Sequence, residues 1–364
     1  MNNKISSCSL FLILSSLLIS PVVANEKIAN GEVAKIISVD LVPSFTEQKI
    51  VITKRDSGAE VLATGNDLGK SVVFFKSDKL LPNVKNKYSP ASFDGFNITF
   101  LKDKDKMISA IDAQGEISDY VYDKSSAKGV LNLVTKEEDN TSYVFNIQFQ
   151  YDEKLKEIRV RRVVYVTANE SCDKSVLSAY LLGRTSLEGK AVVGFDGSEA
   201  FDYLKKLHLN FQSGRQETKK LMPSLVEINI NNALSAYKKG DKKELNESMD
   251  SLLADGGGEE ICPPERYIVQ RYYFKDRVAW TNDVGFLFSE SGHYAEAVEL
   301  LRRVVLENPD RMVAYLNLAD AYWGMGKKAE AKESYQNYYD LMLAAGKKVK
   351  VPERVSMRIT ENSN

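Results

Sequence analysis

The amino-acid sequence predicts an α+β protein, with an N-terminal antiparallel β domain (sandwich or barrel-like) followed by a C-terminal array of α-helices. Three observations predict this. Short runs of alternating apolar and polar residues, separated by polar turns, fill the chain up to about residue 170. Helical spacing then replaces the alternation. Finally, a pattern near the C-terminus recurs after 34 residues, which indicates stacked helical units.

The first 24 residues have the pattern of a secretory signal peptide. Lys4 gives a positive start, residues 10–19 an apolar segment, and the small residues up to Ala24 a cleavage site. The apolar run is too short to span a membrane as a helix, although an uncleaved anchor is the alternative. We therefore expect cleavage near Ala24, a mature chain that begins at Asn25 in the periplasm, and no stable membrane insertion after cleavage.

Composition excludes several classes of function. The 364 residues suffice for two domains with their own cores. The 49 basic and 50 acidic side chains nearly cancel, so no overall field favours nucleic acid. With only 2 histidines in the chain, neither a metal site nor a histidine base is indicated, and we expect no cofactor.

Two cysteines remain after Cys8 is removed with the signal peptide. In an oxidising compartment an even number of cysteines favours a disulfide, here between Cys172 and Cys262. Two separate thiols are the alternative. The bridge would tie the helical array to the end of the β domain.

Residues 25–170 are expected to form the β domain. Aromatic or branched residues take every second position from Tyr143 to Tyr151, which places them on one face of a strand. After a turn, the next strand is expected to continue this face with four aliphatic residues, namely Ile158, Val160, Val164 and Val166.

Residues 171–262 are expected to form a helical connector, with helices at 176–183 and 198–207 and a degenerate helical hairpin at 233–253. Residues 263–347 then form the repeats and their capping helices, and residues 348–364 a polar tail.

The repeat itself rests on small and large residues that recur at an offset of 34. Small residues let two helices approach, large ones fill the space between units, and glycines make the turns. The aligned pairs are Gly285 with Ala319, Phe288 with Tyr322, Gly292 with Gly326, Ala297 with Ala331 and Leu301 with Tyr335.

The stretch AYLNLADAYWGMGKKAEAKESY, from Ala314, resembles the tetratricopeptide repeat family, and the resemblance covers about residues 278–339. Trp280 departs from the family pattern, because it stands one place before the usual aromatic position at Thr281.

The resemblance implies a concave groove, lined by the first helix of each unit, that binds a protein partner. Trp323 either contacts the partner or packs against a neighbouring helix. The positions that would line the groove are Asn282, Phe286, Ser289, Leu316, Asp320 and Trp323.

No pattern in the sequence argues for catalysis, so we expect no enzyme. GNDLGKS, from Gly65, has its first glycine one place too close for a phosphate-binding loop and is interpreted as a hairpin turn. The spacing Ser-x-x-Lys occurs three times without the motifs that accompany it in serine hydrolases.

The resulting hypothesis is an exported interaction protein, a scaffold or chaperone of the cell envelope. One alternative is an inhibitor or immunity protein against a toxin or hydrolase that acts in the periplasm. Others are a glycan- or peptidoglycan-binding module and, last, an envelope hydrolase.

Overall fold

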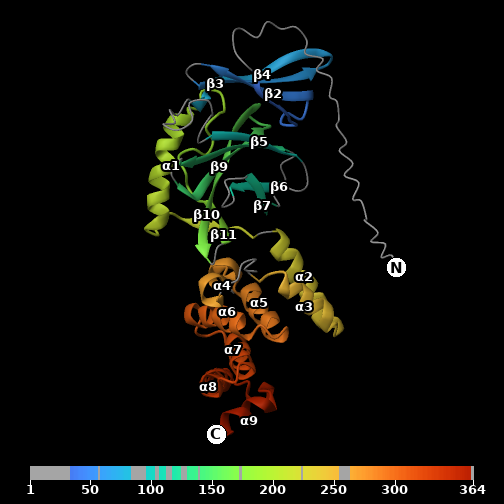
Figure 1. Ribbon diagram of the computed structural model, residues 1–364, viewed down its shortest axis with the longest axis vertical. Helices are drawn as coiled ribbons and strands as arrows, with labels where there is room; N and C mark the ends of the chain where they lie inside the picture. The colour runs from blue at the N-terminus through green and yellow to red at the C-terminus, as the bar shows by residue number, and fades with distance from the viewer. Residues whose placement is uncertain are drawn as a thin grey trace, which may run out of the picture.

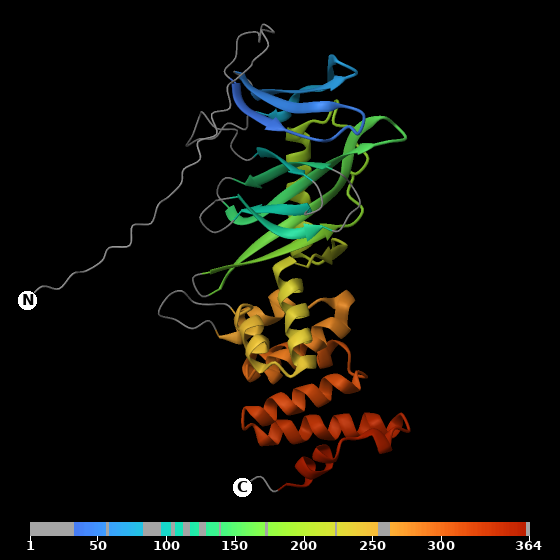
Figure 2. The same cartoon turned by 90° about the vertical axis from the view of Figure 1, so that its right-hand side faces the viewer.

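The computed structural model describes residues 33–55, 58–82, 96–102, 106–111, 117–123, 129–137, 140–171, 174–222, 224–253 and 263–361. Within these, the molecule is elongated, with the β domain at one end and the helical array at the other (Figures 1 and 2). The expected signal peptide and both cysteines of the expected disulfide, Cys172 and Cys262, lie outside the described residues.

The β domain contains two antiparallel sheets and a hairpin, which confirms the expected class of fold. One sheet is a meander in the order β1-β2-β3-β4, the second has the order β12-β11-β10-β9-β8-β5, and β6 pairs with β7. The strands are β1 (Val33–Ser38), β2 (Thr46–Arg55), β3 (Gly58–Asp67), β4 (Lys70–Pro82), β5 (Phe96–Lys102), β6 (Lys106–Ile111), β7 (Ile117–Asp123), β8 (Gly129–Glu137), β9 (Asn140–Asp152), β10 (Glu157–Ser171), β11 (Lys174–Leu182) and β12 (Thr218–Lys220).

One hydrophobic core joins the two sheets and a helix. It combines Ile50 and Phe75 from the first sheet, Phe145 and Phe149 from the second, and Leu204 from the helix α1 (Gly197–Gln212), all buried. Asp196 caps α1 by accepting hydrogen bonds from the backbone N–H groups of the first turn. The alternating residues of β9 from 143 to 151 do lie in this core.

A β-bulge in β10 makes the expected continuation on that strand right for Ile158 and Val160 but wrong for Val164 and Val166. The pairing of β10 with β9 shifts between Val160 and Arg162, so that one extra residue is inserted. Val160 therefore faces the main core, whereas Val164 and Val166 face the opposite side of the sheet and form a second cluster with Val144. A one-residue insertion exchanges the faces of all later side chains, which alternation alone does not reveal.

The second sheet also extends past the boundary expected at residue 170. Of residues 176–183, expected as a helix, all but Gly183 lie in strand β11, which pairs with β10 along its whole length. The segment is amphipathic with either period, and pairing with a long neighbouring strand decides its structure. The helix expected at residues 198–207 is present as α1. The turn after Gly65 is a hairpin between β3 and β4, as expected.

The helical half is a stack of antiparallel helix pairs. The C-terminal segment expected as a polar tail, residues 348–364, contains the helix α9 (Glu353–Thr360), which corrects that expectation. The helices are α2 (Ser224–Lys239), α3 (Lys242–Asp250), α4 (Pro264–Tyr272), α5 (Val278–Glu290), α6 (Tyr294–Glu307), α7 (Met312–Gly324), α8 (Lys328–Ala344) and α9 (Glu353–Thr360), with short 3-10 helices η1 (Lys275–Arg277) and η2 (Lys348–Lys350).

The pair α2–α3 has the burial pattern of a degenerate repeat. With the turn glycines Gly240 and Gly292 aligned, Ala233 takes the place of Gly285 and Met249 that of Leu301, and both are fully buried. The offset between the two turns is 52 residues instead of 34, because an insertion that contains α4 separates this pair from α5.

The insertion also explains the departure at Thr281. Its side chain is fully buried, and Oγ1 accepts a hydrogen bond of 3.1 Å from the backbone N–H of Phe274. Trp280 packs edge-on against the ring of Phe274, 5.5 Å between centroids. A threonine thus holds the inserted segment where the tetratricopeptide pattern has an aromatic side chain.

A partly buried lysine joins the two halves. Lys220, at the end of β12, donates hydrogen bonds to backbone carbonyls at the C-terminal end of α4, among them Arg271 at 3.3 Å, and lies 4.5 Å from the ring centre of Phe274. The neighbouring Lys219 forms an ion pair of 3.5 Å with Asp276. These contacts set the direction in which the array leaves the β domain.

Candidate protein-binding surfaces

Close packing of α5 against α6, and of α7 against α8, fixes which side of each first helix faces its partner helix. A Cβ placed on Gly285 would lie only 2.6 Å from Leu301, so the absence of a side chain lets α5 approach α6. The equivalent position in the next pair holds the fully buried Ala319. The first helix of each pair therefore has a side turned away from its partner helix, and we call the side of α5 and α7 that carries the predicted groove positions the concave face.

Of the residues expected to line the groove, Asn282 is buried between helices. It is 2 % exposed, and its Oδ1 accepts a hydrogen bond of 3.3 Å from Asn317 of α7. This bond ties the first helices of the two repeats together. Asn282 therefore positions the groove and presents little surface to a partner.

Phe286 and Ser289 lie at the half of the groove nearer the β domain, and each is partly exposed. The ring of Phe286 packs edge-to-face against Tyr237 of α2, 5.0 Å between centroids. Tyr237 is 42 % exposed and takes the position in the degenerate repeat that Ser289 and Trp323 take in the others. The 52-residue offset is the reason why the 34-residue period did not identify Tyr237 as a groove residue.

At the other half of the groove, Asp320 holds the C-terminal helix. Its Oδ2 lies 2.8 Å from Nη2 of Arg354, and its Oδ1 lies 2.8 Å from Nη1 of Arg358. The hydroxyl of Tyr335 also donates to Oδ1 at 2.5 Å. Burial, followed by the adjacent carboxylate, raises the pKa of Tyr335, and the hydrogen bond to Asp320 raises the pKa of Arg354.

Leu316 and Trp323 lie in the apolar cluster that includes the fully buried Val355 of the same helix, α9. The guanidinium of Arg358 lies 4.7 Å from the ring centre of Trp323, and Nζ of Lys328 lies at 5.4 Å. Of the two roles considered for Trp323, this structure shows packing against a neighbouring helix.

The carboxylate of Glu290 lies between the two halves of the groove. Glu290 lies at the end of α5, and its surroundings include Asp320 of α7 and Arg354 of α9. Burial and then the negative charge of Asp320 raise the pKa of Glu290. The concave face therefore combines an exposed aromatic pair with two neighbouring carboxylates.

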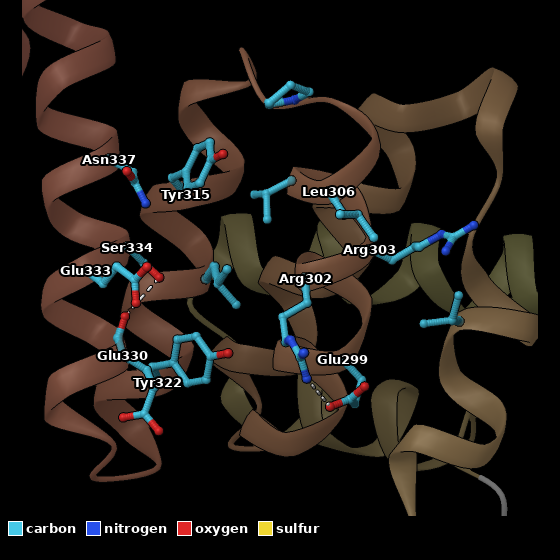
Figure 3. Close-up of a pocket in the computed structure, with 14 residues that line it drawn as sticks. Glu299, Arg302, Arg303, Leu306, Tyr315, Tyr322, Glu330, Glu333, Ser334 and Asn337 are labelled. Carbon is cyan, nitrogen blue, oxygen red and sulfur yellow. Dashed lines mark hydrogen bonds and ion pairs between the residues drawn. The ribbon is translucent and has the colours of Figure 1, made fainter.

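The outer face of the array has an open cleft of about 650 Å³ between α6 and α8, with α7 at its base (Figure 3). Its lining mixes charges of both signs with apolar side chains. Arg302 and Glu299 pair with one another at 3.4 Å, and Leu306 is 72 % exposed. The cleft lies on the side of α7 opposite Asp320, so it is a second surface and not part of the groove.

Within the described ranges, no group of three or more His, Cys, Asp or Glu side chains is placed to hold a metal ion. The same ranges contain no helix with the length and apolar character that crossing a membrane requires.

Comparison with known families identifies one segment. Residues 289–337, from the end of α5 into α8, match the family model described as tetratricopeptide repeat. This confirms the resemblance for the C-terminal part and characterises it as a protein-interaction module. No curated protein matches the chain.

Proposed function

We propose that this protein is an exported interaction protein of the periplasm, which acts as a scaffold or chaperone in the cell envelope. Its partner binds the concave face of the tetratricopeptide array. The observation that carries the proposal is the aromatic pair of Tyr237 and Phe286, which remains partly exposed on that face. Aromatic side chains at the centre of a groove are the residues that most often dominate binding energy in protein interfaces.

The way in which the halves are joined supports a scaffold. Lys220 and Lys219 connect β12 to the inserted segment around α4, and α4 packs against α6 of the array. A groove held at a set angle to a β domain presents two surfaces in one fixed geometry. Such preorganisation lowers the entropy lost when a partner binds both surfaces.

A pull-down with a matched pair of variants tests the proposal. The mature chain from Asn25 is crosslinked to periplasmic extract as wild type, as Tyr237→Ala and as Leu306→Ala. Both variants remove one exposed apolar side chain, the first on the concave face and the second on the outer face. We expect one or more partners that Tyr237→Ala loses and Leu306→Ala retains.

Partners lost only in Leu306→Ala would refute binding at the concave face and would place the binding site in the outer cleft. A single partner bound tightly at one-to-one stoichiometry would favour the inhibitor role over the scaffold. Retention of glycan by the β domain, with no dependence on Tyr237, would favour the carbohydrate-binding alternative.

Export and the disulfide are part of the same proposal. The charged, apolar and small-residue pattern of the first 24 residues supports cleavage near Ala24, and the even number of remaining cysteines supports a bridge between Cys172 and Cys262. N-terminal sequencing of the periplasmic protein and a non-reducing peptide map check both. A mature N-terminus at Met1, or two free thiols, would refute them.

A further inference from the structure

We infer that the concave face selects a helical segment with two arginines one turn apart on either side of an aliphatic residue, and that α9 is a built-in competitor for this segment. The inference rests on the proposed function, because it names the chemistry of the partner at the same groove. It starts from the observation that part of the groove is already filled by a segment of the chain itself.

Asp320 recognises both arginines of α9 at once. Arg354 and Arg358 are four residues apart and therefore lie on the same side of a helix. Arg354 reaches both carboxylate oxygens, with Nε 3.2 Å from Oδ1 and Nη2 2.8 Å from Oδ2, and Arg358 reaches Oδ1 at 2.8 Å. This fork geometry requires guanidinium groups, since the single ammonium of a lysine cannot bridge two oxygens in this way.

The side chain between the arginines provides the apolar contact. Val355 is fully buried, in a cluster with Leu316 and Tyr335. The guanidinium of Arg358 also lies over the ring of Trp323. Of the three groove positions of the second repeat, Asp320 and Trp323 thus contact the arginines of α9, and Leu316 belongs to the same apolar cluster as Val355.

α9 is held weakly enough for another segment to displace it. A helix of eight residues is too short to be stable in water by itself, so α9 depends on its contacts for its helical form. Those contacts are partly solvated: the side chain of Arg354 is 45 % exposed and that of Met357 63 %. The charge-assisted hydrogen bonds to Asp320 therefore carry much of the hold on α9, and a segment that supplies the same two arginines can replace it.

A longer helix could contact more of the concave face than α9 does. The ion pairs and apolar contacts of α9 lie on α7 and α8, whereas the Tyr237–Phe286 pair lies on α2 and α5. Glu290, between these two parts of the groove, adds a second carboxylate beside Asp320. A basic amphipathic helix that spans both parts would replace the contacts of α9 and add the aromatic pair and Glu290.

The test uses a fluorescein-labelled peptide with the sequence of residues 351–361, VPERVSMRITE, and the full mature chain. The chain is compared as wild type and as Arg354→Ala/Arg358→Ala, which releases α9. Fluorescence anisotropy should show the peptide binding at least tenfold more tightly to the double variant. Adding Asp320→Asn to the double variant should weaken binding at least tenfold, and a peptide with both arginines replaced by glutamine should not bind.

Equal binding to both chains, or none to the double variant, would overturn the inference. Circular dichroism verifies that each variant is folded. If the double variant is not, a chain that ends at residue 350 takes its place, with the same expected results. Size-exclusion chromatography separates a further outcome: a wild-type dimer that the peptide converts to monomers would mean that α9 occupies the groove of a second copy, which also overturns internal competition.

This result is independent of the pull-down. A partner that depends on Tyr237, together with a peptide that does not bind, would leave the proposed function standing and remove the inference. If the peptide binds but no partner depends on Tyr237, the inference stands and the proposed function is refuted, because the groove would then recognise only its own helix.

Discussion

Nζ of Lys220, at the end of the last strand of the β domain, lies 3.3 Å from the carbonyl oxygen of Tyr273, just beyond the end of α4. It also donates to the carbonyls of Gln270 and Arg271. One partly buried side chain therefore makes three hydrogen bonds between the two halves. This makes the joint between the domains sensitive to the ionisation of a single group.

The first prediction concerns pH. Burial lowers the pKa of Lys220 from 10.5 to about 7. Between these values the unfolded chain binds more protons than the folded one, so stability should rise with pH, by up to about 1.4 kcal/mol per pH unit. Below about pH 7 the cost of burying the ammonium group is fully present. Guanidinium unfolding of the wild type and of Lys220→Met, from pH 6 to 10, measures the difference.

The Lys220→Met chain should lack this rise, because its side chain does not titrate. Lys219→Met is the matched control, since Lys219 is largely exposed and should leave the slope unchanged. Parallel pH profiles for the wild type and Lys220→Met would contradict the prediction and mean that the three carbonyl groups keep the ammonium charged.

The second prediction compares two glycines of the repeats. In Gly285→Ala the new Cβ would meet Leu301, which is fully buried and cannot move aside, so we expect a loss of about 1–3 kcal/mol in the free energy of unfolding. In Gly324→Ala the Cβ would meet the ring of Tyr294, which is partly exposed and can rotate. The helix propensity of alanine, about 1 kcal/mol better than that of glycine, should then offset most of the cost.

Thermal unfolding of the two variants measures this contrast. A Gly324→Ala chain less stable than Gly285→Ala would contradict this prediction. It would mean that the contact between α7 and α6 accommodates an added methyl group less well than the contact between α5 and α6.

The third prediction uses two buried amides of β9. Both polar atoms of the Asn146 side chain are buried without a hydrogen-bond partner within the described structure, beside the apolar cluster of Val144 and Val164. Asn146→Leu should therefore stabilise the fold by about 1 kcal/mol, since it removes an unsatisfied polar group of similar size.

Gln148, two residues along the same strand, accepts a hydrogen bond of 2.6 Å from Nε of Arg162. Gln148→Leu should cost about 1–3 kcal/mol, because it takes an acceptor away from a mostly buried guanidinium. The free energies of unfolding of the two variants should thus change in opposite directions. Destabilisation by both would indicate that Asn146 has a polar partner when the protein is in solution.

Local patterns determined much of this architecture. The alternation from Tyr143 to Tyr151 identified the core face of β9, and the pairs at an offset of 34 identified the helices of the two repeats and their turns. Residues 176–183 were misassigned because an amphipathic segment of that length satisfies both periods, and only the pairing of β11 with β10 decides between them.

The amino-acid sequence by itself determined the class of fold and the tetratricopeptide segment, because period and residue size act between near neighbours in the chain. It also predicted six groove positions. Tertiary structure alone decided what those positions contact. That Asn282 is buried against Asn317, that Tyr237 joins Phe286, and that Asp320 binds Arg354 all depend on how separate helices pack. The bulge in β10 and the helix α9 at the groove belong to the same category, since each is stabilised by contacts with segments that no local pattern brings together.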